Sequence, residues 1–186
     1  MQYLAVLDTE TNWENRVMSI GIVVADLKRM EVCSSRYYIL TPEAEIGGMY
    51  EQVLQLPPQD QQEIRSRRDA MAEIREWLEQ YHIFGIYAYN ACFDHRLLPE
   101  LSGFRWFDIM RIAAYRQYNV RIPLSAPCCR TGRLRSQYGV EPMLRLLRGD
   151  SSYCETHNAL YDAMDELSIM RLLGRDPQAY GCAEIG

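Results

Sequence analysis

The segment 4–10 constrains the fold more than any other part of the sequence, because an apolar run ends there in two carboxylates one residue apart. The run is typical of a β-strand, in which alternate side chains share a face. Asp8 and Glu10 would therefore project together, while Thr9 points the other way. Two like charges held this close repel unless a cation lies between them, which suggests a site for a hard metal ion. A strand that runs into an ordinary turn is the alternative, because Asp and Thr are common turn residues.

Further apolar segments predict an α/β fold with a mixed five-stranded sheet flanked by helices. Residues 17–26 are almost continuously apolar, as in a central strand, and residues 33–40 are the next candidate. The short polar link between them favours a hairpin, so strands one to three would form an antiparallel meander. Residues 83–89 and 104–107 predict strands four and five.

Apolar residues at three- and four-residue spacing predict the helices. The expected helices cover residues 59–81, a stretch from Asp108 to residue 118, a segment that contains Leu134 and Tyr138 and ends at Gly139, and a last stretch from His157 to Gly174. The length of 186 residues suits one domain. We expect a single domain over 1–186, with a core of about 3–174 and a short C-terminal tail, 175–186.

Composition narrows the functional class. The net charge of −5 argues against bulk attraction to nucleic acid, although it leaves room for an enzyme that holds a strand locally. The six cysteines show no metal-binding or disulfide pattern, and no apolar run reaches the roughly 18 residues that span a bilayer. We therefore expect a cytoplasmic protein with reduced thiols and no membrane partner.

Two more acidic positions lie where α/β folds build their sites. Asp94 follows a strand and opens a helix, where it could be a ligand or a helix cap. His157 precedes Asp162 by five residues at the start of the last helix, and a lone histidine there would more often be structural. Asp108 is best interpreted as a cap, and the arginines of residues 130–148 suggest either a grip on a strand or a solvated surface.

Taken together, these motifs resemble the DEDD 3′–5′ exonucleases of the ribonuclease-H-like fold, in the DEDDh branch whose last motif is H-x-x-x-x-D. Asp8-Thr9-Glu10 resembles the first motif, residues 90–94 the second, and residues 157–162 the third. The resemblance extends from residue 4 to about 174. Polymerase proofreading subunits and ribonuclease T are among the similar proteins. Each motif alone is weak, but the ordered set is specific.

The resemblance implies that Asp8, Glu10, Asp94 and Asp162 hold two Mg²⁺ or Mn²⁺ ions and that His157 is the general base. Paired divalent ions suit phosphodiester hydrolysis, because they stabilise both the attacking and the leaving oxygen. An imidazole titrates near neutral pH and can therefore accept the proton of the attacking water. The chain departs from the family where Asn12 and Trp13 replace a frequent Gly and where Ser19 replaces a frequent Glu, which puts substrate preference in doubt.

The expected function is hydrolysis at the 3′ end of single-stranded nucleic acid, with DNA slightly favoured over RNA, to release nucleoside 5′-monophosphates. Thr11, Trp13 and Phe93 are candidates for substrate binding, since aromatic rings stack on bases of any sequence. Each aromatic residue could equally belong to the core. A DNA polymerase partner, a homodimer, an inactive nucleic-acid-binding module and an endonuclease of the same broad fold remain alternatives.

Overall fold

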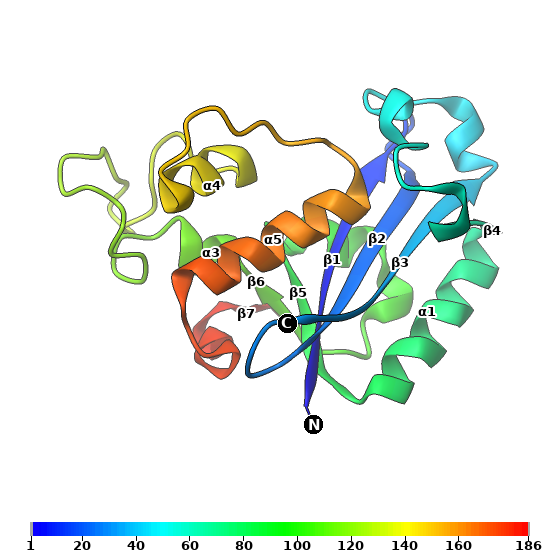
Figure 1. Ribbon diagram of the computed structural model, residues 1–186, viewed down its shortest axis with the longest axis horizontal. Helices are drawn as coiled ribbons and strands as arrows, with labels where there is room; N and C mark the ends of the chain where they lie inside the picture. The colour runs from blue at the N-terminus through cyan, green and yellow to red at the C-terminus, as the bar shows by residue number, and fades with distance from the viewer. Residues whose placement is uncertain (1, 186) are drawn as a thin grey trace.

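The computed structural model describes residues 2–185, and these residues form one mixed seven-stranded sheet with the order β4-β3-β2-β1-β5-β6-β7 (Figure 1). Strands β1 to β3 pair antiparallel, β1 pairs parallel with β5, and β5 pairs parallel with β6. The predicted meander is thus confirmed. The strands are β1 (Tyr3–Thr11), β2 (Val17–Asp26), β3 (Val32–Thr41), β4 (Gln62–Ser66), β5 (Ile83–Ala88), β6 (Trp106–Asp108) and β7 (Glu184–Ile185).

The prediction of five strands was wrong, because two edge strands extend the sheet in the described part of the chain. Strand β4 pairs parallel with β3, and β7 pairs antiparallel with β6. Strand β4 occupies residues that we expected at the start of a helix, and its Ile64 is 56% exposed, as a side chain on an edge strand can be. The η5 helix (Pro177–Ala183) comes directly before β7, and its Tyr180 and Ala183 are buried in the core. Part of the segment expected as a C-terminal tail therefore packs on the core.

Helices cover both faces of the sheet. On one face α1 (Arg67–Tyr81) and α2 (Cys92–Leu97) pack over a core that includes Ala5 and Leu7 of β1. On the other face α5 (Ala159–Leu173) crosses the sheet, and α3 (Met110–Ala113) and α4 (Val140–Arg148) pack beside it. Short 3₁₀ turns, η1 (Glu43–Ile46), η2 (Glu51–Val53), η3 (Gln59–Gln61) and η4 (Pro99–Leu101), complete the connections. No helix within residues 2–185 has the length and apolar character needed to cross a membrane.

Two predicted helices differ from the structure. The helix expected after Asp108 ends at Ala113, and the segment with Leu134 and Tyr138 forms isolated bridges instead of a helix. Gly139 does not end a helix: its extended backbone, with φ of −74° and ψ of 177°, is the N-cap of α4. Helix α4 tolerates Pro142 because its first turn needs no backbone N–H at that position.

Helix α5 lies unusually close to β2, and a glycine permits this approach. A Cβ atom at Gly21 would lie 2.2 Å from the backbone carbonyl carbon of Ala159 and 2.2 Å from the backbone nitrogen of Leu160. Figure 1 shows the first turn of α5 beside the upper ends of β1 and β2. The missing side chain therefore fixes where the first turn of α5 meets the sheet.

We expect Gly21→Ala to destabilise the protein, because its methyl group would push α5 away from β2. Overpacking of this kind costs about 1–3 kcal/mol, which corresponds to a fall in Tm of several degrees for a domain of this size. Thermal unfolding followed by circular dichroism measures the effect. Gly103→Ala is the matched control, because a Cβ atom there meets nothing within 4 Å. Equal Tm values for the two variants would contradict the close approach.

Candidate active site

Strand β1 presents its two carboxylates on the face that α5 covers. Leu4 and Val6 pack in the core beneath α5, so the alternation of the strand places Asp8 and Glu10 on that same face. Both side chains are partly exposed, at the end of β1. The prediction that they project together is confirmed.

Asp94 reaches the same end of the sheet from the first turn of α2, which follows β5 after a short turn. Its carboxylate is 2% exposed, and its Oδ1 accepts a hydrogen bond of 2.7 Å from the Thr9 hydroxyl. The turn is held by Asp108, whose Oδ1 accepts the backbone N–H groups of Asn90 at 3.1 Å and Met110 at 2.9 Å. Asp108 therefore satisfies backbone donors, as expected of a capping residue. Asp94 lies within the first turn of α2 and points at β1 instead of capping the helix.

The start of α5 supplies the last two predicted residues. Asn158 is the N-cap, and its Oδ1 accepts the Leu160 N–H at 3.2 Å. Its Nδ2 donates to the Tyr37 hydroxyl at 3.1 Å and to the Val53 carbonyl at 2.9 Å. These bonds fix the backbone beside His157, and Asp162 follows as a buried residue in the first turn.

The five residues predicted as ligands and base lie together at this end of the sheet. One potential ligand atom from each of Glu10, His157 and Asp162 lies within 4.8 Å of the other two. Asp8 and Asp94 are near enough to interact electrostatically with this group. The ring of Tyr50 stacks on that of His157, with centroids 4.2 Å apart and planes at 15°.

Burial and mutual repulsion raise the pKa of every carboxyl group in the cluster. Burial, followed by the charges of Asp162 and Glu155, raises the pKa of Glu10 to about 8. Burial also raises the pKa of Asp162 to about 8, with Glu155 the next cause, and that of Asp94 to about 7. The pKa of Asp8 is held well above its usual range by burial and then by Glu166. The folded chain thus favours neutral carboxyl groups here unless a cation offsets their charges.

The donor set fits a hard divalent cation. Carboxylate oxygens are the ligands that Mg²⁺ and Mn²⁺ prefer, and one imidazole nitrogen lies beside them. The Oδ1 atom of Asp162 is buried without a hydrogen-bond partner, which is costly unless a ligand compensates it. The residues present therefore suit a metal site.

Sequence reasoning missed three residues of this site. Glu155 lies close enough to raise the pKa of both Glu10 and Asp162, and burial raises its own pKa to about 7. Glu166 lies one helical turn after Asp162, a spacing that could have suggested it. Tyr50 lies in a segment with no periodicity, so nothing in the sequence indicated its stacking.

The predicted substrate-binding residues differ in how far they are exposed. Trp13 is 65% exposed, next to Gly47, whose carbonyl accepts the Trp13 backbone N–H at 3.1 Å. Phe93 is 38% exposed in the first turn of α2, and Thr11 is partly buried at the end of β1. Tyr89, which precedes the turn into α2, is a further aromatic residue near Asp94 in the sequence, but it is buried and donates to the Tyr138 carbonyl at 2.6 Å.

Several arginines of residues 130–148 are engaged within the protein. Arg145 contacts Glu141 at 2.9 Å, and Arg148 contacts Asp165 at 3.3 Å. Arg133 lies over the ring of Tyr138, and Arg135 donates to the Cys128 carbonyl at 3.2 Å. These contacts favour a structural role over a grip on a strand.

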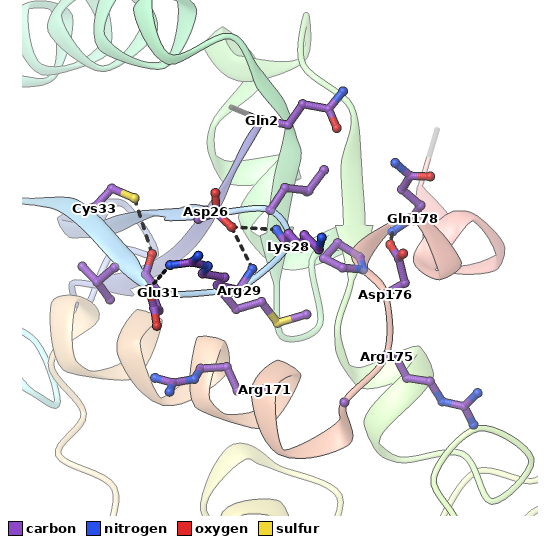
Figure 2. A pocket seen from close by; sticks show the side chains of 15 residues that line it. Gln2, Asp26, Lys28, Arg29, Glu31, Cys33, Arg171, Arg175, Asp176 and Gln178 are labelled. Carbon is purple, nitrogen blue, oxygen red and sulfur yellow. Dashed lines mark hydrogen bonds and ion pairs between the residues drawn. The ribbon is translucent and has the colours of Figure 1, made fainter.

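The large hollow in Figure 2 is not this site. It has a volume of about 1090 Å³ and lies between the β2–β3 hairpin and the residues that follow α5. The carboxylate of Asp26 accepts the backbone N–H groups of Lys28 and Arg29 there, and none of the five predicted residues lines it. The hollow lies at the opposite ends of β2 and α5 from the carboxylates.

We expect the Tm of the metal-free protein to fall as the pH rises from 5 to 8. The carboxyl groups of Glu10 and Asp162 have pKa values of about 8 when folded and about 4 when unfolded. Between these values the folded chain binds more protons, so its stability is lost as the pH rises. A tenfold difference in proton affinity between the folded and unfolded states changes the free energy of unfolding by about 1.4 kcal/mol. For a domain of this size, that corresponds to several degrees in Tm.

Differential scanning fluorimetry in EDTA tests this expectation. Asp162→Asn lacks one of the titrating groups and should show a shallower decline, and saturating Mn²⁺ should stabilise the wild type more at pH 8 than at pH 5. A wild-type Tm that rises over the same range would contradict the electrostatic account.

Comparison with known proteins gives structural matches alone. No family model matches the sequence, and no curated protein sequence matches it. The nuclease domain of 3′hExo, a DEDDh family member bound to rAMP, is 16% identical, with a TM-score of 0.64 over 93% of this chain and 92% of that one. Exonuclease I of E. coli in complex with a dA16 oligonucleotide is 14% identical, with a TM-score of 0.64 over 97% of this chain.

A third match has a TM-score of 0.63 at 13% identity; it is a 3′-exonuclease that recognises the 3′ end of a histone mRNA stem-loop. This chain spans 42% of exonuclease I and 65% of the third protein. The chain therefore has the fold of these 3′-exonucleases, one of which is a DEDDh family member.

Proposed function

We propose that this protein is a divalent-metal-dependent 3′–5′ exonuclease that acts on single-stranded DNA or RNA and releases nucleoside 5′-monophosphates. One observation carries the proposal: Glu10, His157 and Asp162 offer ligand atoms within 4.8 Å of one another, beside Asp8 and Asp94. The matched structures are of 3′-exonucleases, and among what these proteins bind are a histone mRNA stem-loop and a dA16 oligonucleotide. A polymerase partner and a homodimer stay predictions from the sequence.

Asp8, Glu10, Asp94 and Asp162 would hold two Mg²⁺ or Mn²⁺ ions. Bound divalent ions supply positive charge to the scissile phosphate and to the departing 3′ oxygen. The Thr9 hydroxyl orients Asp94 through its 2.7 Å hydrogen bond. Strand β1 and helices α2 and α5 would thus supply the four carboxylates from one end of the sheet.

His157 would accept the proton of the attacking water. Its imidazole lies beside the carboxylates and is held flat against Tyr50, which limits rotation of the ring. Exposed Trp13 and Phe93 would contact the terminal bases by stacking. These rings provide affinity that the net negative charge of the protein does not.

We expect His157→Ala to reduce hydrolysis by about 100-fold or more, because general base catalysis is worth about 10²–10⁴ in rate. The assay uses 5′-labelled single-stranded DNA and RNA of matched sequence with Mg²⁺ or Mn²⁺. Wild-type protein should give a descending ladder that is lost in EDTA and in Asp162→Asn. Asp165→Asn is the matched control, since Asp165 pairs with Arg148.

Oligonucleotide binding should be nearly unchanged in His157→Ala, which separates proton transfer from affinity. Near-normal turnover in this variant would contradict the assignment of His157 as the general base. If the wild type cleaves neither DNA nor RNA with either metal, the proposed function is wrong.

We expect Trp13→Ala to weaken binding of single-stranded oligonucleotides, because stacking on an aromatic side chain contributes about 1–3 kcal/mol per base. Fluorescence anisotropy in a His157→Ala background measures Kd while hydrolysis is slow. Val32→Ala removes another exposed apolar side chain, at the hollow remote from the carboxylates, and should leave Kd unchanged. Equal Kd values for the two variants would show that Trp13 does not contact the substrate.

A further inference from the structure

Glu166 is a buried acidic residue that the proposed mechanism does not use. It is 2% exposed, on the face of α5 that packs against the sheet. Its Oε2 atom is buried without a hydrogen-bond partner. A carboxylate buried in this way is costly unless it has a compensating role.

The position of Glu166 matches the geometry of the carboxylate cluster. Along α5, Asp162 and Glu166 are one turn apart and project from the same side of the helix. Along β1, Glu10 and Asp8 are two residues apart and share a face. Asp162 is the charge that acts most strongly on Glu10, and Glu166 is the one that acts most strongly on Asp8. Helix α5 packs on β1, so the side of the helix that carries Asp162 and Glu166 faces the carboxylates of the strand.

We propose that Glu166 is a fifth carboxylate of the metal site, and that it positions and strengthens the binding of the ion next to Asp8. This inference rests on the proposed function, because it assigns a residue to that same site. The unpartnered Oε2 is available to accept from a water of the ion's hydration shell or to bind the ion. The charges of Asp94 and Asp162 also act on Glu166, so it faces the whole cluster.

A structural role is the competing explanation. The backbone of Tyr89 donates a hydrogen bond to Glu166, which could by itself connect α5 to the end of β5. Glu166→Gln separates the two roles, because the amide oxygen still accepts that bond while the charge is lost. A structural role predicts an unchanged affinity for metal, and a metal-site role predicts a weaker one.

The test is Mn²⁺ titration by isothermal calorimetry, with Tm measured in EDTA. We expect Glu166→Gln to raise the Kd for Mn²⁺ by about tenfold or more, as supporting residues of metal sites do. The metal-free Tm should be unchanged or higher, because the amide oxygen still accepts the Tyr89 hydrogen bond while the repulsion from the neighbouring carboxylates is removed. Asp165→Asn is the matched control, since it removes the same charge from the preceding residue of α5, which contacts Arg148. The charge of Asp165 also acts on Asp162, so the change in Kd for Glu166→Gln must exceed that of the control.

The outcomes separate this inference from the proposed function. An Mn²⁺ Kd for Glu166→Gln equal to that of the wild type overturns the inference alone, and so does a metal-free Tm that falls without a change in Kd. A wild type that binds no Mn²⁺ overturns the proposed function and this inference together. A higher Kd with an unchanged or higher metal-free Tm supports the fifth carboxylate.

Discussion

Repulsion between buried carboxylates is the constraint on which the rest of this structure depends. The cluster is held by two rigid elements that face each other. Strand β1 pairs with β2 at Asp8 and Glu10 and with β5 as far as Val6, so the backbone that carries the two carboxylates is held in the sheet. Helix α5 is held against β2 at Gly21, which keeps Asp162 opposite the strand. The central position of β1 in the sheet therefore both buries its apolar residues in the core and fixes the position of its two carboxylates.

The segment before α5 shows how local backbone geometry supports the site. His157 has φ of 57°, in the left-handed region that residues other than glycine seldom occupy. The Asn158 side chain compensates this conformation with bonds to the Leu160 N–H and the Val53 carbonyl. Such backbone strain persists where the surrounding contacts determine it, which is common at functional sites. The hydrogen bonds of Asn158 thus fix the backbone that positions the imidazole of His157.

The central sheet could be predicted from the sequence because its strands follow local patterns, whereas the set of five motif residues came from the resemblance of three short motifs to a known family. The alternation that ends in Asp8 and Glu10 is such a pattern. Strand β4 was missed because Ile64 is its single apolar residue and its pairing with β3 is non-local. Helix α4 was missed because a glycine such as Gly139 can begin a helix as well as end one. The spacing of Glu166 from Asp162 places it on the same side of α5, but its burial depends on tertiary packing.

The stack of Tyr50 on His157 makes an irregular segment part of the candidate active site. Asn158 binds the Val53 carbonyl of the same segment, so two separate contacts join residues 50–53 to the start of α5. A protein engineer who moved the four carboxylates and the histidine onto a similar scaffold would therefore have to carry this segment with them. Exchange of the 42–58 connection for that of another protein of this fold would change the environment of the imidazole without altering any residue of the three motifs.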